Sequence, residues 1–199
     1  MGRRKLVPDI DDKIMSEVMK MTMKVGTGLV STKVIAKKLG ISEPVIFTHF
    51  KTKADLMNAT FVKACQPLKK DKITAIVLAK GKSATFEDYR PALLWALSFK
   101  KETVYIHHYL ASSYYDNVIA LKALTPFFSE VRKLMTIFGA TAIGNEEEFN
   151  FVIFTYFHNR IDILNSFIQG RFEANEDLLK MADCYLTGAT FACLGIQRS

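Results

Sequence analysis

The chain has 199 residues, of which 49% are hydrophobic, and a formal net charge of +7. This length and composition support a folded globular protein and exclude an intrinsically disordered one. No apolar run is long enough to span a membrane, and the basic start MGRRKLVPDIDD lacks the apolar segment of a signal peptide, so we expect a soluble cytoplasmic protein. The three cysteines follow no metal-ligand or disulfide spacing, so we expect reduced thiols, no metal and no cofactor.

Charged and aromatic residues are distributed unevenly along the chain. Residues 1–80 contain 16 Lys or Arg and 7 Asp or Glu, a net charge of +9, whereas residues 81–199 contain 11 and 13, a net charge of −2. Aromatic residues show the opposite bias, because 20 of the 23 lie after residue 80. The sequence therefore predicts a small basic N-terminal module that contacts phosphates and a larger, aromatic-rich body.

The first predicted helix covers residues 10–25, where apolar residues recur at helical spacing on one face. Asp9 stands at its cap position, and Gly26 and Gly28 follow its last turn. We expect this helix to brace the two helices after it. The basic residues 3–5 before it form either an arm that contacts phosphates or a solubilising tail.

Residues 31–53, STKVIAKKLGISEPVIFTHFKTK, are the most informative stretch of the chain. Ser31 can cap a helix that ends at Gly40, a residue type that readily takes the left-handed conformation of a helix terminus. Ser42 can cap a second helix with Pro44 in its first turn, where a missing N–H is harmless. The pattern predicts a helix-turn-helix, and the alternative is an ordinary helical hairpin inside a bundle.

The second helix of this motif has a predicted buried side and a predicted outward side. The buried side comprises Ile46, Phe47 and Phe50. The outward side comprises Glu43, Val45, Thr48 and His49. After the motif, Thr52 and Asp55 have the spacing of a capping box, which predicts a third helix running towards Gln66.

The stretch STKVIAKKLGIS-EPVIFTHF-KTKADL resembles the DNA-binding domain of the TetR family of bacterial transcriptional regulators. The family pattern is a capping Ser or Thr, then Ile-Ala, then Gly-Val/Ile-Ser, an aromatic run that ends in Phe, and Lys before an acidic residue and Leu. The matching residues are Ser31, Ile35, Ala36, Gly40, Ile41, Ser42, Phe47, Phe50, Lys53, Asp55 and Leu56. Phe47 departs from the usual Tyr, and it lacks the hydroxyl that could reach a phosphate.

The resemblance implies an all-α protein with two domains. A three-helix DNA-binding domain with the helix-turn-helix would occupy residues 1–52, and a larger helical ligand-binding and dimerisation domain would occupy residues 53–199. A homodimer also follows from the DNA argument, because one short recognition helix reads few bases and a two-fold dimer doubles the site. The expected partner is then a palindromic, double-stranded DNA operator.

The candidates for DNA contact lie on and around the second helix of the motif. They are Ser31, Lys33, Ser42, Glu43, Pro44, Val45, Phe47, Thr48, His49, Lys51 and Lys53. The resemblance implies that Val45, Thr48 and His49 face the groove or its wall, where Thr48 could reach a base edge or a thymine methyl. The lysines are phosphate candidates, and Glu43 is a first-turn dipole partner rather than a base reader. The alternative for His49 is a partly buried spacer.

The rest of the chain is also predicted to be helical. The expected segments before residue 140 are 68–80, 89–101, 103–115, 117–124 and a helix that Thr125-Pro126 starts and Gly139 ends. Two terminal helices follow, capped by Asn145 and Asn175 and ending near Ile168 and Gly195.

Side chains in these later helices supply candidates for a ligand pocket and for a dimer interface. The pocket candidates are Trp95, Phe99, Tyr105, His108, Tyr109 and Tyr115, which would suit a flat or apolar small molecule. In the resemblance, the two terminal helices pair with their copies as a four-helix bundle through Ile153, Phe157, Ile161, Leu164, Leu179, Ala182, Leu186 and Ala189. The alternative in both cases is that these side chains form the core of the single chain.

An enzyme is the competing class of function. The residue types of a catalytic triad are present in Ser112, Ser113, His107 and Asp116, but no nucleophile elbow or glycine-rich phosphate loop accompanies them, so we expect no catalysis. The resemblance therefore implies a TetR-like repressor that a small hydrophobic or aromatic ligand releases from its operator. The remaining alternative is a constitutive or architectural DNA-binding protein that has no ligand and a well-filled core.

Overall fold

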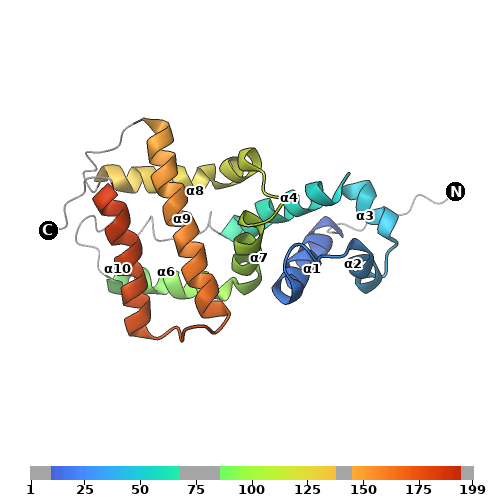
Figure 1. The fold of residues 1–199 in the computed structure, drawn as a ribbon, viewed down its shortest axis with the longest axis horizontal. Coiled ribbons are helices and arrows are strands. Elements are labelled where there is room, and N and C mark those ends of the chain that lie inside the picture. The colour runs from blue at the N-terminus through green and yellow to red at the C-terminus, as the bar shows by residue number, and fades with distance from the viewer. Residues whose placement is uncertain (1–9, 68–85, 138–144, 194–199) are drawn as a thin grey trace.

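The computed structural model describes residues 10–67, 86–137 and 145–193. These residues form helices and turns without a strand among them, which confirms the predicted all-α fold. In Figure 1, one end of the elongated molecule contains α1 (Ile10–Val25), α2 (Thr32–Leu39), α3 (Glu43–His49) and α4 (Lys53–Ala64). The other end contains α6 (Phe86–Ser98), α8 (Asn117–Ile137), α9 (Glu146–Ile168) and α10 (Glu176–Cys193), and α7 (Lys100–Leu110) lies between the two ends.

Local capping interactions define the N-terminal helices largely where the sequence predicted them. The Ser31 hydroxyl accepts a hydrogen bond from the Val34 backbone N–H at 3.4 Å, and Gly40 ends α2 with a φ of 66°. Thr52 and Asp55 each accept a hydrogen bond from the other's backbone N–H at 3.0 Å, which is the predicted capping box. Ser42 precedes α3 as predicted, but its side chain makes no capping hydrogen bond.

One hydrophobic core runs from the N-terminal helices into the larger end of the molecule. Ile14 of α1, Ile35 of α2, Ile46 of α3, Phe61 of α4 and Tyr105 of α7 are all fully buried members of it. Burial of each such side chain stabilises the fold by roughly 1.5–3 kcal/mol relative to exposure. Because α7 packs on α1, α4 and α9, this core joins the N-terminal helices mechanically to the C-terminal helices.

Several predicted helix boundaries in the middle of the chain are wrong. The helices predicted at 89–101 and 103–115 are α6, which ends at Ser98, and α7, which ends at Leu110. The helix α8 is continuous across residues 117–137, so the prediction that Thr125-Pro126 starts a new helix is also wrong.

Proline is tolerated inside α8 because apolar residues before and after it in the helix are buried in the protein core. Leu124 is fully buried before Pro126, and Phe128 is buried after it. The Thr125 hydroxyl donates a hydrogen bond to the Leu121 carbonyl at 2.8 Å. This side-chain donor lies next to Pro126, which has no backbone N–H to donate. Burial in the body therefore outweighs the local preference of proline for a helix start.

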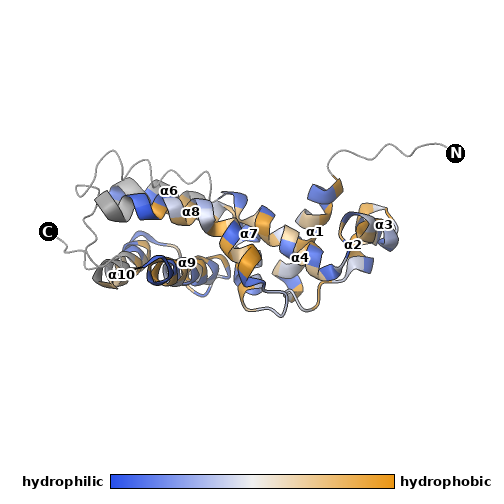
Figure 2. Ribbon diagram, turned by 90° about the horizontal axis from the view of Figure 1, so that it is seen from above, coloured by the Kyte–Doolittle hydropathy of each residue, from blue (hydrophilic) through white to orange (hydrophobic). Residues whose placement is uncertain are grey.

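The last two helices follow their predicted caps. The side chain of Asn145 accepts from the Glu148 N–H, and that of Asn175 accepts from the Leu178 N–H, each at 2.9 Å. Figure 2 shows α9 and α10 as a layer packed beneath α6 and α8. No helix in the described part of the chain combines the length and apolar character that crossing a membrane requires.

Some predicted features lie outside the described residues. They are residues 3–5, the Asp9 cap, the segment 68–80, and the helix ends near Gly139 and Gly195.

Candidate DNA-binding site and effector cavity

The helix-turn-helix is held by hydrogen bonds across its turn. The Ile41 N–H donates to the Ala36 carbonyl at 3.0 Å, which closes the turn after α2. The Thr32 hydroxyl donates to the Glu43 carboxylate at 2.5 Å and thereby joins the first turns of α2 and α3. Glu43 therefore fixes the angle between the two helices, and its carboxylate is engaged with α2.

The outer surface of α3 presents short polar and apolar side chains. Pro44 and Thr48 are exposed, Val45 is half-buried, and the Thr48 hydroxyl donates to the Val45 carbonyl at 2.7 Å. Phe47 is 39% exposed, so its predicted place on the buried side is wrong, whereas Ile46 and Phe50 are buried as expected. Phe47 is one residue after Ile46 and therefore points about 100° away from it around the helix, so it joins the candidate contact surface instead.

The basic candidates surround this surface. Lys33 and Lys51 are exposed, and Lys53, the first residue of α4, lies with its Nζ 5.5 Å from the centroid of the Tyr114 ring. Ser31 is half-buried as the cap of α2, and Ser42 is exposed at the start of α3. The structure thus brings the predicted DNA-contact residues together at the α2–α3 end of the molecule (Figure 1).

His49 is the last residue of α3 and does not face outward freely. Its Nδ1 lies 2.6 Å from Oδ1 of Asp11 on α1, and 17% of its side chain is exposed. The neighbouring Asp12 of α1 forms an ion pair with Lys63 of α4. Two consecutive carboxylates on α1 therefore hold α3 and α4.

Two pocket candidates, Tyr105 and Tyr109, are part of the core instead. The Tyr105 hydroxyl donates to the Met57 carbonyl at 2.7 Å, and the Tyr109 hydroxyl donates to the Asn58 side chain at 2.8 Å. Phe61 stacks on Tyr109 with ring centroids 4.3 Å apart. Burial raises the pKa of both tyrosine hydroxyls, so they remain neutral donors that fasten α7 to α4.

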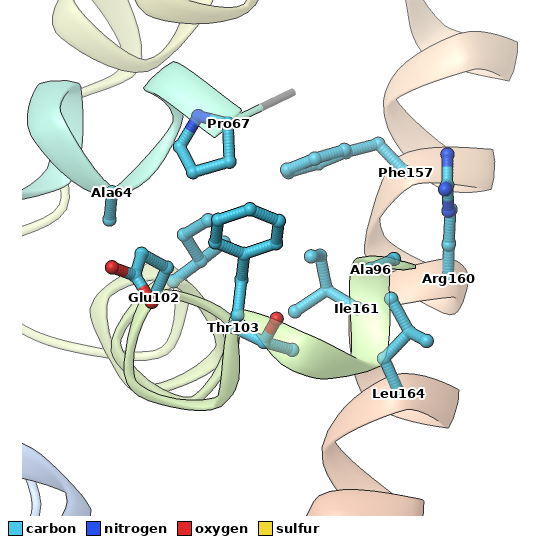
Figure 3. A pocket seen from close by; sticks show the side chains of 11 residues that line it. Ala64, Pro67, Ala96, Glu102, Thr103, Phe157, Arg160, Ile161 and Leu164 are labelled. Atoms are coloured by element: carbon cyan, nitrogen blue, oxygen red, sulfur yellow. The ribbon is translucent and has the colours of Figure 1, made fainter. Parts of the chain in front are cut away.

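The cavity of interest lies between α4, α6, α7 and α9 (Figure 3). Its volume is about 20 Å³, enough for one or two water molecules. Its walls are mainly apolar and come from Ala64, Pro67, Ala96, Phe99, Glu102, Thr103, Ile106, Phe157, Arg160, Ile161 and Leu164. Small side chains such as Ala64 and Ala96 leave part of this space unfilled where the helices cross. Alanine is common in helices, so these residues did not indicate a cavity in the sequence.

Among the ligand candidates, the structure places Phe99 on the wall of this cavity. His108 and Tyr115 do not line it: His108 lies next to Gly26 at the end of α1, and Tyr115 packs edge-on against Tyr109. Trp95 belongs to α6, and its side chain is not among those that the structure describes.

The stripe predicted to form the dimer interface faces the interior of the single chain. Most of its members are buried there, namely Ile153, Phe157, Ile161, Leu164, Leu179 and Leu186, while Ala182 is half-buried and Ala189 is exposed. Among the described residues, the large apolar side chains exposed on α9 and α10 are instead Phe151, Met181 and Tyr185, with 72%, 66% and 59% exposure. Both sides of these helices are apolar, so periodicity alone could not choose between them.

The catalytic-triad residue types serve as local caps or, for His107, contact a neighbouring helix. The Ser112 hydroxyl donates to the Tyr109 carbonyl at 2.8 Å, and the Asp116 carboxylate accepts from the Ile119 N–H at 3.0 Å at the start of α8. His107 lies 3.4 Å from the Asp162 carboxylate of α9. These contacts account for the three residues structurally.

Three histidines lie where α7 meets α1 and α9. The rings of His107 and His108 are 5.4 Å apart, and the His158 ring lies 4.9 Å from that of Phe154. Burial, followed by the proximity of His107, lowers the pKa of His108, and burial is also the largest cause that lowers the pKa of His158. The folded protein therefore resists protonation of these two side chains.

This resistance predicts a loss of stability in acid. Unfolded histidine titrates near pH 6.5, so below that pH the unfolded chain binds protons that the folded chain excludes. The contribution of the two neutral histidines to the free energy of unfolding is therefore complete above pH 6.5. It decreases as pH falls towards their lowered pKa values in the folded protein. Urea unfolding at several pH values should show this decrease, and it should be smaller in a H108Q/H158Q double variant. An identical pH dependence in the double variant would contradict the assignment.

Comparison with known proteins agrees with this geometry. Residues 14–60 match the family of bacterial regulatory proteins described as the tetR family, and none of the curated proteins matches the chain. The crystal structure of a TetR family transcription regulator from Marinobacter aquaeolei VT8 is similar over 90% of this chain and 94% of its own, with a TM-score of 0.65 and 14% identity. A structure from Shewanella sp. PV-4, assigned to the same family, is similar over 92% and 95%, with a TM-score of 0.64 and 18% identity.

The structural likeness extends well beyond the residues that the family model matches. The family match includes the helix-turn-helix and most of α4, and the structural likeness extends to the C-terminal helices. Residues 14–60 therefore carry the sequence signature of the tetR family, and the chain has the fold of two solved structures of TetR family transcription regulators.

Proposed function

We propose that the protein is a homodimeric repressor that binds a palindromic operator and leaves it when a small apolar or aromatic effector binds. The observation that carries the proposal is the exposed face of α3, with Thr48 and Phe47 at its surface and lysines around it. Residues 1–52 would bind DNA in the cytoplasm, and residues 53–199 would bind the effector and the second subunit.

The dimer would form through the exposed apolar side chains of α9 and α10. Phe151, Met181 and Tyr185 are large, apolar and more than half exposed, which is unfavourable in water and suits a subunit interface. A two-fold axis through this face would present two α3 helices to successive major grooves, about 34–36 Å apart.

The effector would bind by enlarging the cavity between α4, α6, α7 and α9. A cavity of about 20 Å³ is too small for an organic molecule, so binding requires the surrounding helices to move. Ala64 at the end of α4 lines the cavity, and Lys53 at the start of α4 closely follows α3. Movement of α4 would thus change the separation of the two recognition helices, by an amount limited by the effector's preference for the moved state.

A constitutive regulator without an effector is the second candidate, and the small size of the cavity favours it. The two candidates differ in one measurement. Compounds that raise the melting temperature of the protein are tested for release of bound operator DNA. Release supports the effector mechanism, whereas stabilising compounds that leave operator affinity unchanged would contradict it.

The proposed DNA contacts are tested by two substitutions that should act differently. Thr48→Ala should change the preference at one base position of the operator, because Thr48 lies exposed on α3. Its effect at that position should be about 1–3 kcal/mol, measured as relative affinities for single-base variants of the operator. Uniform weakening on every sequence would refute base recognition by Thr48.

Lys53→Ala is the matched comparison for phosphate contact. It should weaken binding to all sequences similarly and reduce the slope of log affinity against log salt by about one for each phosphate that the lysine neutralises. The measurement is a salt titration of the same operator duplex. An unchanged salt slope would show that Lys53 makes no phosphate contact and serves only to pack on Tyr114.

A further inference from the structure

The contact between Asp11 and His49 joins α1 to the recognition helix at its last residue. The Asp11 carboxylate oxygen lies 2.6 Å from Nδ1 of His49, close enough for an ion pair when the imidazole is protonated. An ionised carboxylate only accepts hydrogen bonds, so this close approach favours the form of the imidazole that has a hydrogen on Nδ1. Asp11 therefore sets which ring nitrogen carries the proton.

The second ring nitrogen, Nε2, is the atom available to DNA. Within the described residues no protein atom is paired with Nε2, and it is not among the buried polar atoms without a partner. In a neutral ring with its hydrogen on Nδ1, Nε2 is an acceptor. A phosphate oxygen is also an acceptor, so a contact between them requires a second proton and a positively charged ring.

Asp11 is the carboxylate positioned to stabilise that positive charge. The other charged groups on the surrounding elements have different partners: Asp12 of α1 pairs with Lys63, Glu43 of α3 accepts from Thr32, and Lys53 of α4 lies over Tyr114. Lys51, which follows α3, is exposed. Charged hydrogen bonds of the imidazolium–carboxylate kind are roughly twice as strong as neutral ones.

We propose that Asp11 is a positioning residue for DNA binding: it orients His49, holds its hydrogen on Nδ1, and stabilises the protonated ring that donates from Nε2 to an operator phosphate. The inference rests on the proposed DNA-binding function and adds a residue of α1 to it. It makes operator binding proton-linked.

The sign of one substitution separates this role from ordinary electrostatics. Asp11 carries a negative charge close to DNA, so simple repulsion predicts that Asp11→Asn tightens binding at every pH. Positioning predicts the reverse, because the protonated ring loses its counter-charge. Asp12→Asn is the matched control: it removes an equal charge one residue away, from a pair with α4 that does not touch α3.

The experiment uses the full-length protein and a labelled duplex that the wild-type protein has selected from random-sequence DNA. Affinity is measured at constant ionic strength between about pH 8.5 and 5.5, the range in which histidine titrates. Wild-type binding should tighten as pH falls. D11N should bind about tenfold more weakly near neutral pH, with its profile displaced to lower pH, and D12N should stay within about twofold of wild type with an unchanged profile.

A second variant keeps the proposal testable if D11N folds poorly. H49Q should flatten the pH profile, and adding D11N to H49Q should have little further effect. The proposal is overturned if D11N binds as tightly as wild type with the same pH profile, or if H49Q and wild type have coincident profiles. Failure of the wild-type protein to select any sequence would instead refute the proposed DNA-binding function.

Discussion

Met181→Asp should convert the protein from a dimer to a monomer and weaken operator binding by about 10²–10⁴-fold. Met181 is 66% exposed on α10, close in sequence to Tyr185, which is 59% exposed. A carboxylate buried at an apolar interface has no partner and costs several kcal/mol. Loss of the second subunit removes the gain from simultaneous binding of two half-sites, which accounts for the large decrease in operator affinity.

The matched control is Val118→Asp. Val118 is 74% exposed and lies on α8, away from the proposed interface, so the same apolar-to-acidic change should leave both mass and affinity unaltered. Sedimentation or light scattering measures the mass, and anisotropy measures the affinity. A Met181→Asp protein that remains a dimer would place the interface elsewhere.

Phe61→Ala should reduce the free energy of unfolding by about 3–5 kcal/mol, the usual cost of removing a large aromatic side chain from a core. Phe61 is fully buried and stacks on Tyr109 at 4.3 Å, in the core that joins α4 to α7. Most domains have only about 5–15 kcal/mol of net stability, so the variant should be close to unfolding. Urea unfolding followed by circular dichroism measures the change.

Phe47→Ala makes the same chemical change on the surface of α3. Phe47 is 39% exposed, so its removal should cost less than about 1 kcal/mol of stability. It should nevertheless reduce operator affinity, because it lies on the proposed contact surface. Equal destabilisation by the two substitutions would contradict the assignment of Phe47 to the surface and Phe61 to the core.

The features that the sequence predicted well depend on residues close together in the chain. The Ser31 cap, the Gly40 terminus and the Thr52–Asp55 capping box each involve residues within a few positions, so residue type and spacing determine them. The helix-turn-helix and its family resemblance follow from these features. The same local argument failed at Pro126, where burial of Leu124 and Phe128 keeps α8 continuous.

The features that the sequence could not predict depend on which helices meet. Tyr105 and Tyr109 suggested a pocket because they are aromatic, but their hydroxyls bond to α4 and make them part of the core. In α9, Phe151 and Ile153 are both apolar, yet the first is exposed and the second is buried. Only the packing of α9 on α7 and α10 distinguishes the two sides.

The contact of His49 with Asp11 was also beyond sequence reasoning. An outward position was predicted for His49 from its place on the helix, with a partly buried spacer as the alternative. The structure shows a ring with 17% exposure that is paired through one nitrogen. Both descriptions therefore hold in part, because one side of the ring faces α1 and the other reaches the surface.

The central claim is that the α3 face of a dimer recognises a specific DNA sequence. The most direct test is fluorescence anisotropy of the purified protein on DNA from upstream of its own gene and on scrambled DNA of the same composition, at low and moderate salt. We expect tight binding that prefers the upstream sequence and persists at moderate salt. If the upstream DNA fails, a duplex selected from random sequence provides the same comparison. Weak binding that disappears equally for specific and scrambled DNA in both tests would contradict the claim.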